Sequence, residues 1–412
     1  MTLPIPPAHS PVRGSEIIGA ALAVASASRK EAEGALERAL ALRFHAMEVA
    51  TCGSGTQALQ LALTIAASAR PRGSNPAVAL PAYACFDLAS AAIGSDSPVI
   101  FYDLDPVTLG PDLASVEAAL ARGAGVLVAA PLFGLPVAWE PLEILAHEHG
   151  VVLVEDAAQG GGGSWAGRLI GELGALSVLS FGRGKGWTGG GGGALLARGE
   201  MAGRLRHAKG ARGAVSGWGG RAAVTTTAQW ILGRPGLYAI PAAIPGLALG
   251  ETMYHPPVPV RKMTKFSLQL ARRTAESSAT EAASRRACAF DLEARIAEVP
   301  GVSRVRPASG GEPGYLRLPV LVEGGSRALR DPGTARALGI MPGYPLALPE
   351  LPALKGCILE PTSEMPVARR LAAELLTLPT HRFVTPKIAE RIASALGGRK
   401  GDPPAHGFER PS

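Results

Sequence analysis

Between about residues 50 and 200, short apolar runs alternate with stretches of helical character about ten to fifteen residues long. The expected strands are Val78–Leu80, Val99–Tyr102, Val126–Ala130, Val151–Val154 and Ser177–Phe181. The expected helices are Thr56–Arg70, Asp112–Arg122 and Pro141–His149. This alternation predicts an α/β fold with a mostly parallel central sheet flanked by helices. Ligands of such sheets bind beyond the carboxyl ends of the strands, so we expect the chemistry just after each strand.

The chain has 412 residues, 47% of them hydrophobic, which is enough for about two domains. We expect an N-terminal arm at 1–13, a large domain at 14–260, a smaller α+β domain at 261–396 and a disordered tail at 397–412. Helices are expected at 265–297, 367–376 and 386–395, with a strand at 315–322.

Residues 222–260 form an apolar insertion in the large domain. Its longest uncharged stretch, Pro235–Gly250, is too short and too proline-rich to cross a bilayer. We therefore expect no integral membrane span. A buried or subunit-interface element, a lid and a membrane-surface contact all remain open for this insertion.

The formal charge is +7, from 41 basic and 34 acidic residues. The basic residues are scattered, and no nucleic-acid-binding motif accompanies them. We therefore expect no nucleic-acid partner, and mild basicity suits a small anionic substrate.

The four cysteines, Cys52, Cys85, Cys288 and Cys357, form no C-x-x-C pair, and their spacing suits neither zinc nor a disulfide framework. This pattern predicts a reduced compartment and no bound metal. The apolar run Ile17–Ala27 ends like a signal-peptide cleavage site, but Glu16 opens it. We favour an amphipathic helix running to about Arg43 and a cytoplasmic protein.

Three segments carry residues suited to chemistry. In the first, the glycine-rich turn Cys52–Thr56 leads directly into a predicted helix. Backbone N–H groups at such a helix start bind anions, and the hydroxyls of Ser54 and Thr56 could add hydrogen bonds. An ordinary helix cap explains the same residues.

The second segment, Glu155–Gln159, follows the strand predicted at Val151–Val154. There Asp156 would lie at the mouth of a site, where its carboxylate could hold a cationic ring nitrogen. A helix cap is again the alternative.

The third segment, Ser180–Gly186, places Lys185 among glycines after a predicted strand. It is no Walker loop, because glycine and not Ser or Thr follows Lys185. A lysine there could form a Schiff base, bind an anion or lie exposed to solvent.

In sequence order, the three segments supply an anion cradle, a carboxylate and a lysine. This order resembles that of the pyridoxal-phosphate enzymes of the aspartate aminotransferase fold (fold type I). More narrowly, the chain is similar to the DegT/DnrJ/EryC1/StrS family of sugar aminotransferases. The matching motifs are Ser54–Leu59, Val99–Pro106, Val154–Gln159, Ser180–Lys185, Leu378–His381 and, more loosely, Pro131–Gly134.

The resemblance implies a role for each site residue. Lys185 would form the Schiff base with pyridoxal 5'-phosphate and move the proton, and Asp156 would pair with the ring nitrogen. Gln159 would lie near the phenolic oxygen of the cofactor. The phosphate would be held by Ser54, Gly55, Thr56 and Ser180.

Two departures from the family pattern leave positions open. Where the family stacks an aromatic residue on the cofactor ring, the aligned residue is Cys85, with Tyr83 and Phe86 beside it. Where an asparagine of the family reaches the partner subunit's phosphate, this chain offers Arg261 or Lys262.

The resemblance therefore implies an aminotransferase that moves an amino group from glutamate to a keto sugar, nucleotide-linked, in polysaccharide or secondary-metabolite biosynthesis. It also implies a homodimer. The alternatives are another fold type I reaction, such as a lyase, and a cofactor-binding regulator that has lost catalysis.

Overall fold

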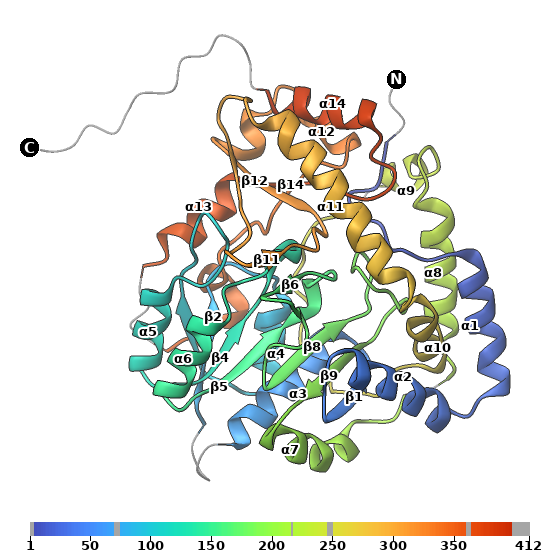
Figure 1. Cartoon of the computed structure of the whole chain (residues 1–412), viewed down its shortest axis with the longest axis vertical. Helices are drawn as coiled ribbons and strands as arrows, with labels where there is room; N and C mark the ends of the chain where they lie inside the picture. Colours follow the sequence, from blue (N-terminus) through green and yellow to red (C-terminus); the bar gives the residue numbers. More distant parts are fainter. Residues whose placement is uncertain (1–3, 70–74, 216, 245–249, 360–363, 398–412) are drawn as a thin grey trace, which may run out of the picture.

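The computed structural model describes residues 4–69, 75–215, 217–244, 250–359 and 364–397. The tail predicted at 397–412 lies, after its first residue, outside this part of the chain. Figure 1 shows a large sheet with its helices in the lower part of the view and a smaller group of strands and helices, formed by the C-terminal residues, above it.

The large sheet contains all five strands predicted from the alternation. Its strand order is β1 (Glu48–Cys52), β9 (Gly193–Ala197), β8 (Leu176–Ser180), β5 (Val152–Asp156), β4 (Ala124–Ala129), β2 (Ala77–Pro81) and β3 (Val99–Tyr102). The five adjacent strands β8, β5, β4, β2 and β3 pair in parallel with one another. In contrast, β9 is antiparallel to both of its neighbours, β1 and β8. The predicted α/β class with a mostly parallel sheet is confirmed.

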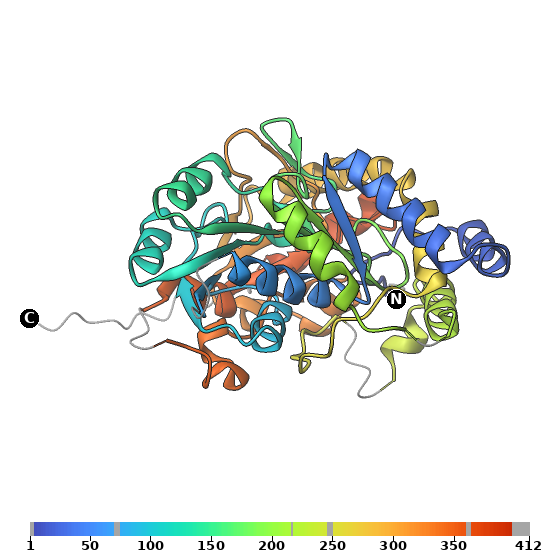
Figure 2. The ribbon, with the colours of Figure 1, turned by 90° about the horizontal axis from the view of Figure 1, so that it is seen from below.

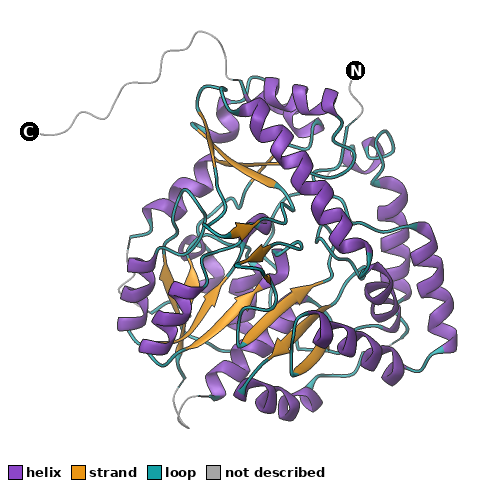
Figure 3. Ribbon diagram, in the orientation of Figure 1, coloured by secondary structure: helices purple, strands orange, loops and turns teal. Residues whose placement is uncertain are grey.

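Helices cover both faces of this sheet, as Figures 2 and 3 show. Val78 and Leu80 of β2 pack in one apolar cluster with the helix α3 (Gly55–Ser68), whereas Ala77 and Ala79 pack in another with α5 (Leu113–Ala121) and α6 (Glu140–Glu148). Successive side chains of a strand point to opposite faces, so a strand buried on both faces is apolar throughout. This explains the uninterrupted apolar runs of the sequence.

The single helix predicted up to Arg43 is two helices, α1 (Gly14–Ser26) and α2 (Arg29–Arg43). The first helix ends at Ser26 with Ala27 as its C-cap. Ser28 caps the second helix, because its hydroxyl accepts from Glu31 N (3.2 Å) and its N–H donates to the Glu31 carboxylate (2.8 Å). This capping box is a sequence signature of a new helix start and corrects the prediction.

The helix predicted at 265–297 is also divided, into α10 (Lys265–Thr274) and α11 (Ser277–Ile296). Through Phe266 and Leu270, α10 packs against α1, so it lies with the N-terminal helices. The division of the chain into domains at residue 260 stays a prediction.

The C-terminal residues form a four-stranded antiparallel sheet in the order β10 (Val302–Arg304), β12 (Leu318–Val322), β14 (Leu375–Leu378) and β13 (Met341–Pro342). Helices α11, α12 (Pro332–Ala337), α13 (Pro366–Glu374) and α14 (Pro386–Leu396) accompany it. The strand predicted from residue 315 begins only at Leu318, because Tyr315 has a left-handed backbone (φ 38°). A small sheet of β6 (Ser164–Trp165), β7 (Arg168–Leu169) and β11 (Gly311–Glu312) joins the two regions.

The apolar insertion contains α8 (Gly220–Leu232), which lies along α1 in Figure 1, and the short α9 (Ala239–Ala242). It is not buried within this chain: Thr226 is the buried residue of α8, and Val224 is 70% exposed. No helix in the described ranges has the length and apolar character needed to cross a membrane.

Glu155, the residue before the predicted site carboxylate, fixes the carboxyl end of β5. Its buried carboxylate accepts hydrogen bonds from the N–H groups of Gly171 (2.7 Å), Leu173 (3.0 Å) and Gly174 (3.2 Å) and from Ser177 Oγ (2.7 Å). Burial raises its pKa, and these donors oppose the rise. Glu155 thus ties the turn before β8 to the end of β5, the two strands that carry Asp156 and Ser180.

We expect Glu155→Ala to lower the free energy of unfolding by at least about 3 kcal/mol, because three buried N–H groups lose their acceptor. Chemical denaturation measures this loss. Glu148→Ala, an exposed glutamate on α6, should change stability by no more than about 0.5 kcal/mol. Equal effects of the two substitutions would contradict the structural role of Glu155.

Candidate active site

A small cavity lies at the carboxyl ends of β5 and β8. Seven of the nine predicted site residues line it, whereas Ser54 and Phe86 do not. The lining residues are Gly55, Thr56, Leu59, Cys85, Asp87, Asp156, Ala158, Gln159, Ser180 and Lys185. The three segments singled out in the sequence therefore meet in one place.

The anion cradle is formed where α3 begins beside the end of β8. A Cβ atom at Gly55 would come within 2.7 Å of Ser180 Cβ, so this contact requires glycine. Ser54 caps the helix, its hydroxyl accepting from Gln57 N (3.1 Å), while Gly55 and Thr56 face the cavity. The helix-cap reading therefore holds for Ser54, and the start of α3 is also open to an anion.

Asp156 lies at the end of β5 with 8% of its surface exposed. Its carboxylate accepts one backbone hydrogen bond, from Ala158 N (3.2 Å), and forms no ion pair with another described residue. Burial raises its pKa to about 6; Asp87 and Glu155 add to this rise, and the Ala158 hydrogen bond and the charge of Lys185 oppose it. A buried carboxylate of this kind is suited to a cationic ligand.

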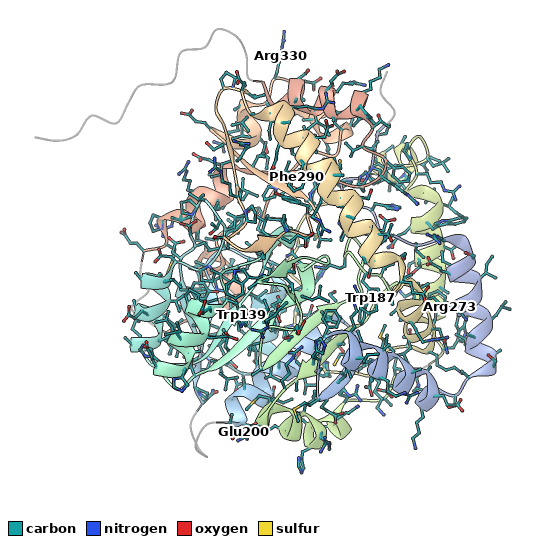
Figure 4. All side chains as sticks on the ribbon, viewed as in Figure 1. Trp139, Trp187, Glu200, Arg273, Phe290 and Arg330 are labelled. Atoms are coloured by element: carbon teal, nitrogen blue, oxygen red, sulfur yellow. The ribbon has the colours of Figure 1, made fainter. Side chains whose placement is uncertain are left out.

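Lys185 lies in a glycine-rich loop that is held on both sides. Gly184 has a left-handed backbone (φ 73°), and its N–H donates to Ser10 Oγ of the N-terminal arm (3.0 Å). Trp187, labelled in Figure 4, follows the lysine and donates from Nε1 to the carbonyl oxygen of Ala271 (2.7 Å). The buried indole packs against Phe181 and anchors the loop, which leaves the Lys185 amine at the cavity.

Of the three candidates for the ring-stacking position, Cys85 lines the cavity. Its Sγ donates to Asp87 Oδ2 (3.5 Å), and burial raises its pKa to about 12, so it is a neutral thiol. Phe86 is buried in the core at the start of α4 (Asp87–Gly94), and the Tyr83 hydroxyl accepts from Tyr344 N (2.8 Å). No aromatic side chain occurs among the described lining residues.

Gln159 connects the cavity to the C-terminal part of the chain. Its Oε1 accepts from Phe133 N (3.2 Å), and its Nε2 donates to the hydroxyl of Tyr344 (2.6 Å). The Tyr344 ring also stacks on Phe133 at a centroid distance of 5.7 Å.

The sequence did not point to Tyr344 or Asp87 as site residues. Tyr344 lies far from the motifs along the chain, and Asp87 resembles an ordinary acidic residue in the first turn of a helix. The sequence signal that could have identified Asp87 is its position two residues after Cys85, which aligns with the ring-stacking position of the family.

Two further predicted features lie near the site. Arg261 donates its N–H to Gln57 Oε1 (2.8 Å) and accepts from Gly53 N (2.8 Å), so its backbone lies behind the cradle of its own chain. Its side chain is exposed, and its role in a partner subunit stays a prediction. His381 is buried with its Nε2 2.7 Å from the carbonyl oxygen of Pro6, and burial lowers its pKa to about 4. This histidine connects the C-terminal region to the N-terminal arm.

The charges of the cavity match those of pyridoxal phosphate. The start of α3 suits a phosphate, the buried carboxylate of Asp156 suits a protonated ring nitrogen, and Lys185 offers an amine to an aldehyde. The close approach at Gly55 and the burial of Asp156 with one backbone hydrogen bond are the observations that support this fit. Fold and site together define the class of fold type I pyridoxal-phosphate enzymes.

Comparison with known proteins gives the family. Residues 18–210 match the model of the DegT/DnrJ/EryC1/StrS aminotransferase family. This match covers slightly less than half of the chain, and it confirms the resemblance found in the sequence.

Two curated relatives and one solved structure illustrate the similarity. A pleiotropic regulatory protein of Geobacillus stearothermophilus is 33% identical over 146 residues, 35% of this chain and 38% of the relative. The L-glutamine:2-deoxy-scyllo-inosose aminotransferase of Streptomyces kanamyceticus is 35% identical over 176 residues, 42% of this chain and 40% of the relative. The chain thus matches about two fifths of the length of these relatives. The crystal structure of S. venezuelae DesV with a ketimine intermediate superimposes with a TM-score of 0.73 at 22% identity, covering 93% of both chains, and shows the shared fold.

We expect Asp156→Asn to stabilise the cofactor-free protein at pH 7.5 by up to about 3 kcal/mol relative to the unsubstituted chain. The folded-state pKa of about 6 exceeds the ordinary value of 3.8, so the folded chain holds the proton more tightly than the unfolded chain. The free energy of unfolding should therefore fall as pH rises from about 4 to 6, and asparagine removes this dependence.

Denaturation at pH 4 and pH 7.5 measures the effect. Asp96→Asn is the matched control, because Asp96 is exposed and its left-handed backbone (φ 53°) suits asparagine. An Asp156→Asn protein whose advantage is greater at pH 4 would contradict the burial argument.

Proposed function

We propose that this chain is a pyridoxal-phosphate-dependent aminotransferase that moves an amino group from glutamate or glutamine to the carbonyl of a keto sugar or related polyol ring. The observation that carries the proposal is the single cavity that joins Lys185, Asp156 and the start of α3. The similarity to a relative named as an L-glutamine:2-deoxy-scyllo-inosose aminotransferase supports glutamine or glutamate as the amino donor. A nucleotide on the acceptor stays a prediction from the resemblance.

Each residue of the cavity would make its own contribution. Bound pyridoxal phosphate supplies an electron sink for the electrons released when a substrate C–H bond breaks. Asp156 would keep the ring nitrogen protonated, and the N–H groups at Gly55 and Thr56 with the Ser180 hydroxyl would bind the phosphate. The Lys185 amine would hold the cofactor covalently and then take up and return the substrate proton.

We expect Lys185→Ala to lower turnover by at least about 10²-fold, because the group that moves the proton is lost. Borohydride reduction followed by mass spectrometry should place the cofactor on the peptide that contains Lys185 and show no attachment in the variant. Lys355→Ala, at an exposed position, should keep both properties. A cofactor attached to a different lysine would refute the assignment.

We propose further that the protein acts as a homodimer in the cytoplasm. The exposed apolar side chains Ile18 (63%), Leu22 (70%), Val224 (70%) and Ile240 (57%) support a partner surface. The four cysteines are all free, which is consistent with a reducing compartment. Arg261 or Lys262 of the second copy would complete the phosphate site.

We expect sedimentation to give a dimer, and the double substitution Arg261→Gln, Lys262→Gln to weaken cofactor binding about tenfold by removing positive charge. Arg221→Gln, exposed on α8, is the control and should bind the cofactor normally. A fully active monomer would contradict this part of the proposal.

A cofactor-binding regulator is the second candidate function. The thiol at the ring-stacking position and the similarity to a protein named as a pleiotropic regulator favour it. Amino donors separate the two functions: bleaching of the bound chromophore by glutamate or glutamine supports aminotransfer, and a chromophore unchanged by every donor supports the regulator.

A further inference from the structure

The side chain of Gln159 joins the active-site cavity to the C-terminal sheet. Gln159 follows β5 of the large sheet, in the lower part of Figure 1, whereas Tyr344 follows β13 at the edge of the C-terminal sheet. The amide Nε2 of Gln159 donates to the Tyr344 hydroxyl (2.6 Å), and Oε1 accepts from Phe133 N (3.2 Å). Both ends of the amide are therefore held, and its orientation is fixed.

This orientation determines what Gln159 can offer to a ligand. A primary amide carries two N–H groups, and the Tyr344 hydroxyl accepts from one of them. The amide oxygen is turned toward Phe133 N. Because Gln159 lines the active-site cavity, its second N–H is left to donate to an oxygen atom of a ligand there.

Phe133, Gln159 and Tyr344 form a closed set in which each residue contacts the other two. The Phe133 ring stacks on the Tyr344 ring at a centroid distance of 5.7 Å and an interplanar angle of 19°. The backbone of Phe133 is left-handed (φ 55°), a conformation that bulky residues rarely adopt. Its N–H binds Gln159, and its carbonyl oxygen accepts from Leu316 N (2.9 Å). A strained backbone that is held from both sides beside a ligand cavity indicates a functional constraint.

Tyr344 is itself immobilised by its surroundings. It is 6% exposed, and its N–H donates to the Tyr83 hydroxyl (2.8 Å). The preceding residue, Gly343, must be glycine, because a Cβ atom there would overlap the Tyr83 hydroxyl. Burial raises the pKa of Tyr344 well above its ordinary value, so its side chain is a neutral phenol. Tyr344 is not among the described residues that line the cavity, so it acts on a ligand through Gln159.

We infer that Tyr344 is a positioning residue for the cofactor, which holds the Gln159 amide so that an N–H faces the phenolic oxygen of bound pyridoxal phosphate. This inference deepens the proposed function and rests on its placement of the cofactor in this cavity. Tyr344 lies outside residues 18–210, the part of the chain that matches the family model. The C-terminal sheet thus influences the electronic state of a cofactor that the large sheet binds.

The pH titration of the bound chromophore reports this contact. An N–H that donates to the phenolic oxygen stabilises its negative charge, and the oxygen then holds the proton of the neighbouring nitrogen less strongly. Loss of the donor should therefore raise the midpoint pH at which the visible absorbance changes. We expect Gln159→Ala to raise this midpoint by about 1 pH unit. Tyr344→Phe keeps the stacked ring but loses the acceptor, and should raise it by about 0.5.

The double substitution Gln159→Ala, Tyr344→Phe separates a positioning role from a structural one. It should titrate like Gln159→Ala alone, because no amide is left to orient. Tyr102→Phe is the matched control, since Tyr102 is fully buried and its hydroxyl donates to the carbonyl oxygen of Val128 (2.7 Å), outside the cavity lining. The control should lower the free energy of unfolding and leave the midpoint unchanged.

Phe133→Leu replaces Tyr344→Phe if that variant fails to fold. It removes the ring that stacks on Tyr344, and should raise the midpoint by a smaller amount. Titrations that are the same in all the variants, or shifts that add in the double variant, would overturn the inference. Bleaching by glutamate or glutamine is measured on the same samples and decides the proposed aminotransfer separately. A chromophore that no donor bleaches, with the shifts intact, refutes the aminotransfer and supports the positioning role.

Discussion

Asp156 and Glu155 are neighbours at the end of β5, so their side chains point to opposite faces of the sheet and their carboxylates have different surroundings. Glu155 accepts three backbone N–H groups and a serine hydroxyl, so its burial is compensated within the chain. Asp156 accepts one backbone N–H, and burial raises its pKa to about 6 although the charge of Lys185 opposes the rise. A buried carboxylate with so few partners favours a cationic ligand, because binding then offsets the desolvation cost. The rest of the site is arranged around this carboxylate.

Local and periodic signals account for what the sequence predicted well. Strands buried on both faces are apolar throughout, so the five parallel strands were found with their ends shifted by no more than two residues. The rule that ligands bind beyond the carboxyl ends of strands then selects Asp156, Ser180 and Lys185 from the sequence. These residues line one cavity because parallel strands bring their ends to the same edge of the sheet.

Contacts between distant parts of the chain account for what the sequence did not predict. The bond from Gln159 to Tyr344 joins residues 185 positions apart, and no local pattern marks either as the other's partner. Phe86 adjoins Cys85 in sequence, yet the start of α4 turns it into the core. The start of the second helix at Ser28 is marked in the sequence by a capping box, Ser28 followed three residues later by Glu31, which the prediction of one continuous helix did not use.

The N-terminal arm is hydrogen-bonded to two distant parts of the chain. It contacts the Lys185 loop through Ser10 and the C-terminal region through the carbonyl oxygen of Pro6, so one short segment touches both sides of the site. Glu155 and the turn at 171–174 hold the end of β5 without any contribution from the arm. The sheet therefore fixes the position of Asp156, whereas the arm contacts the loop that carries Lys185.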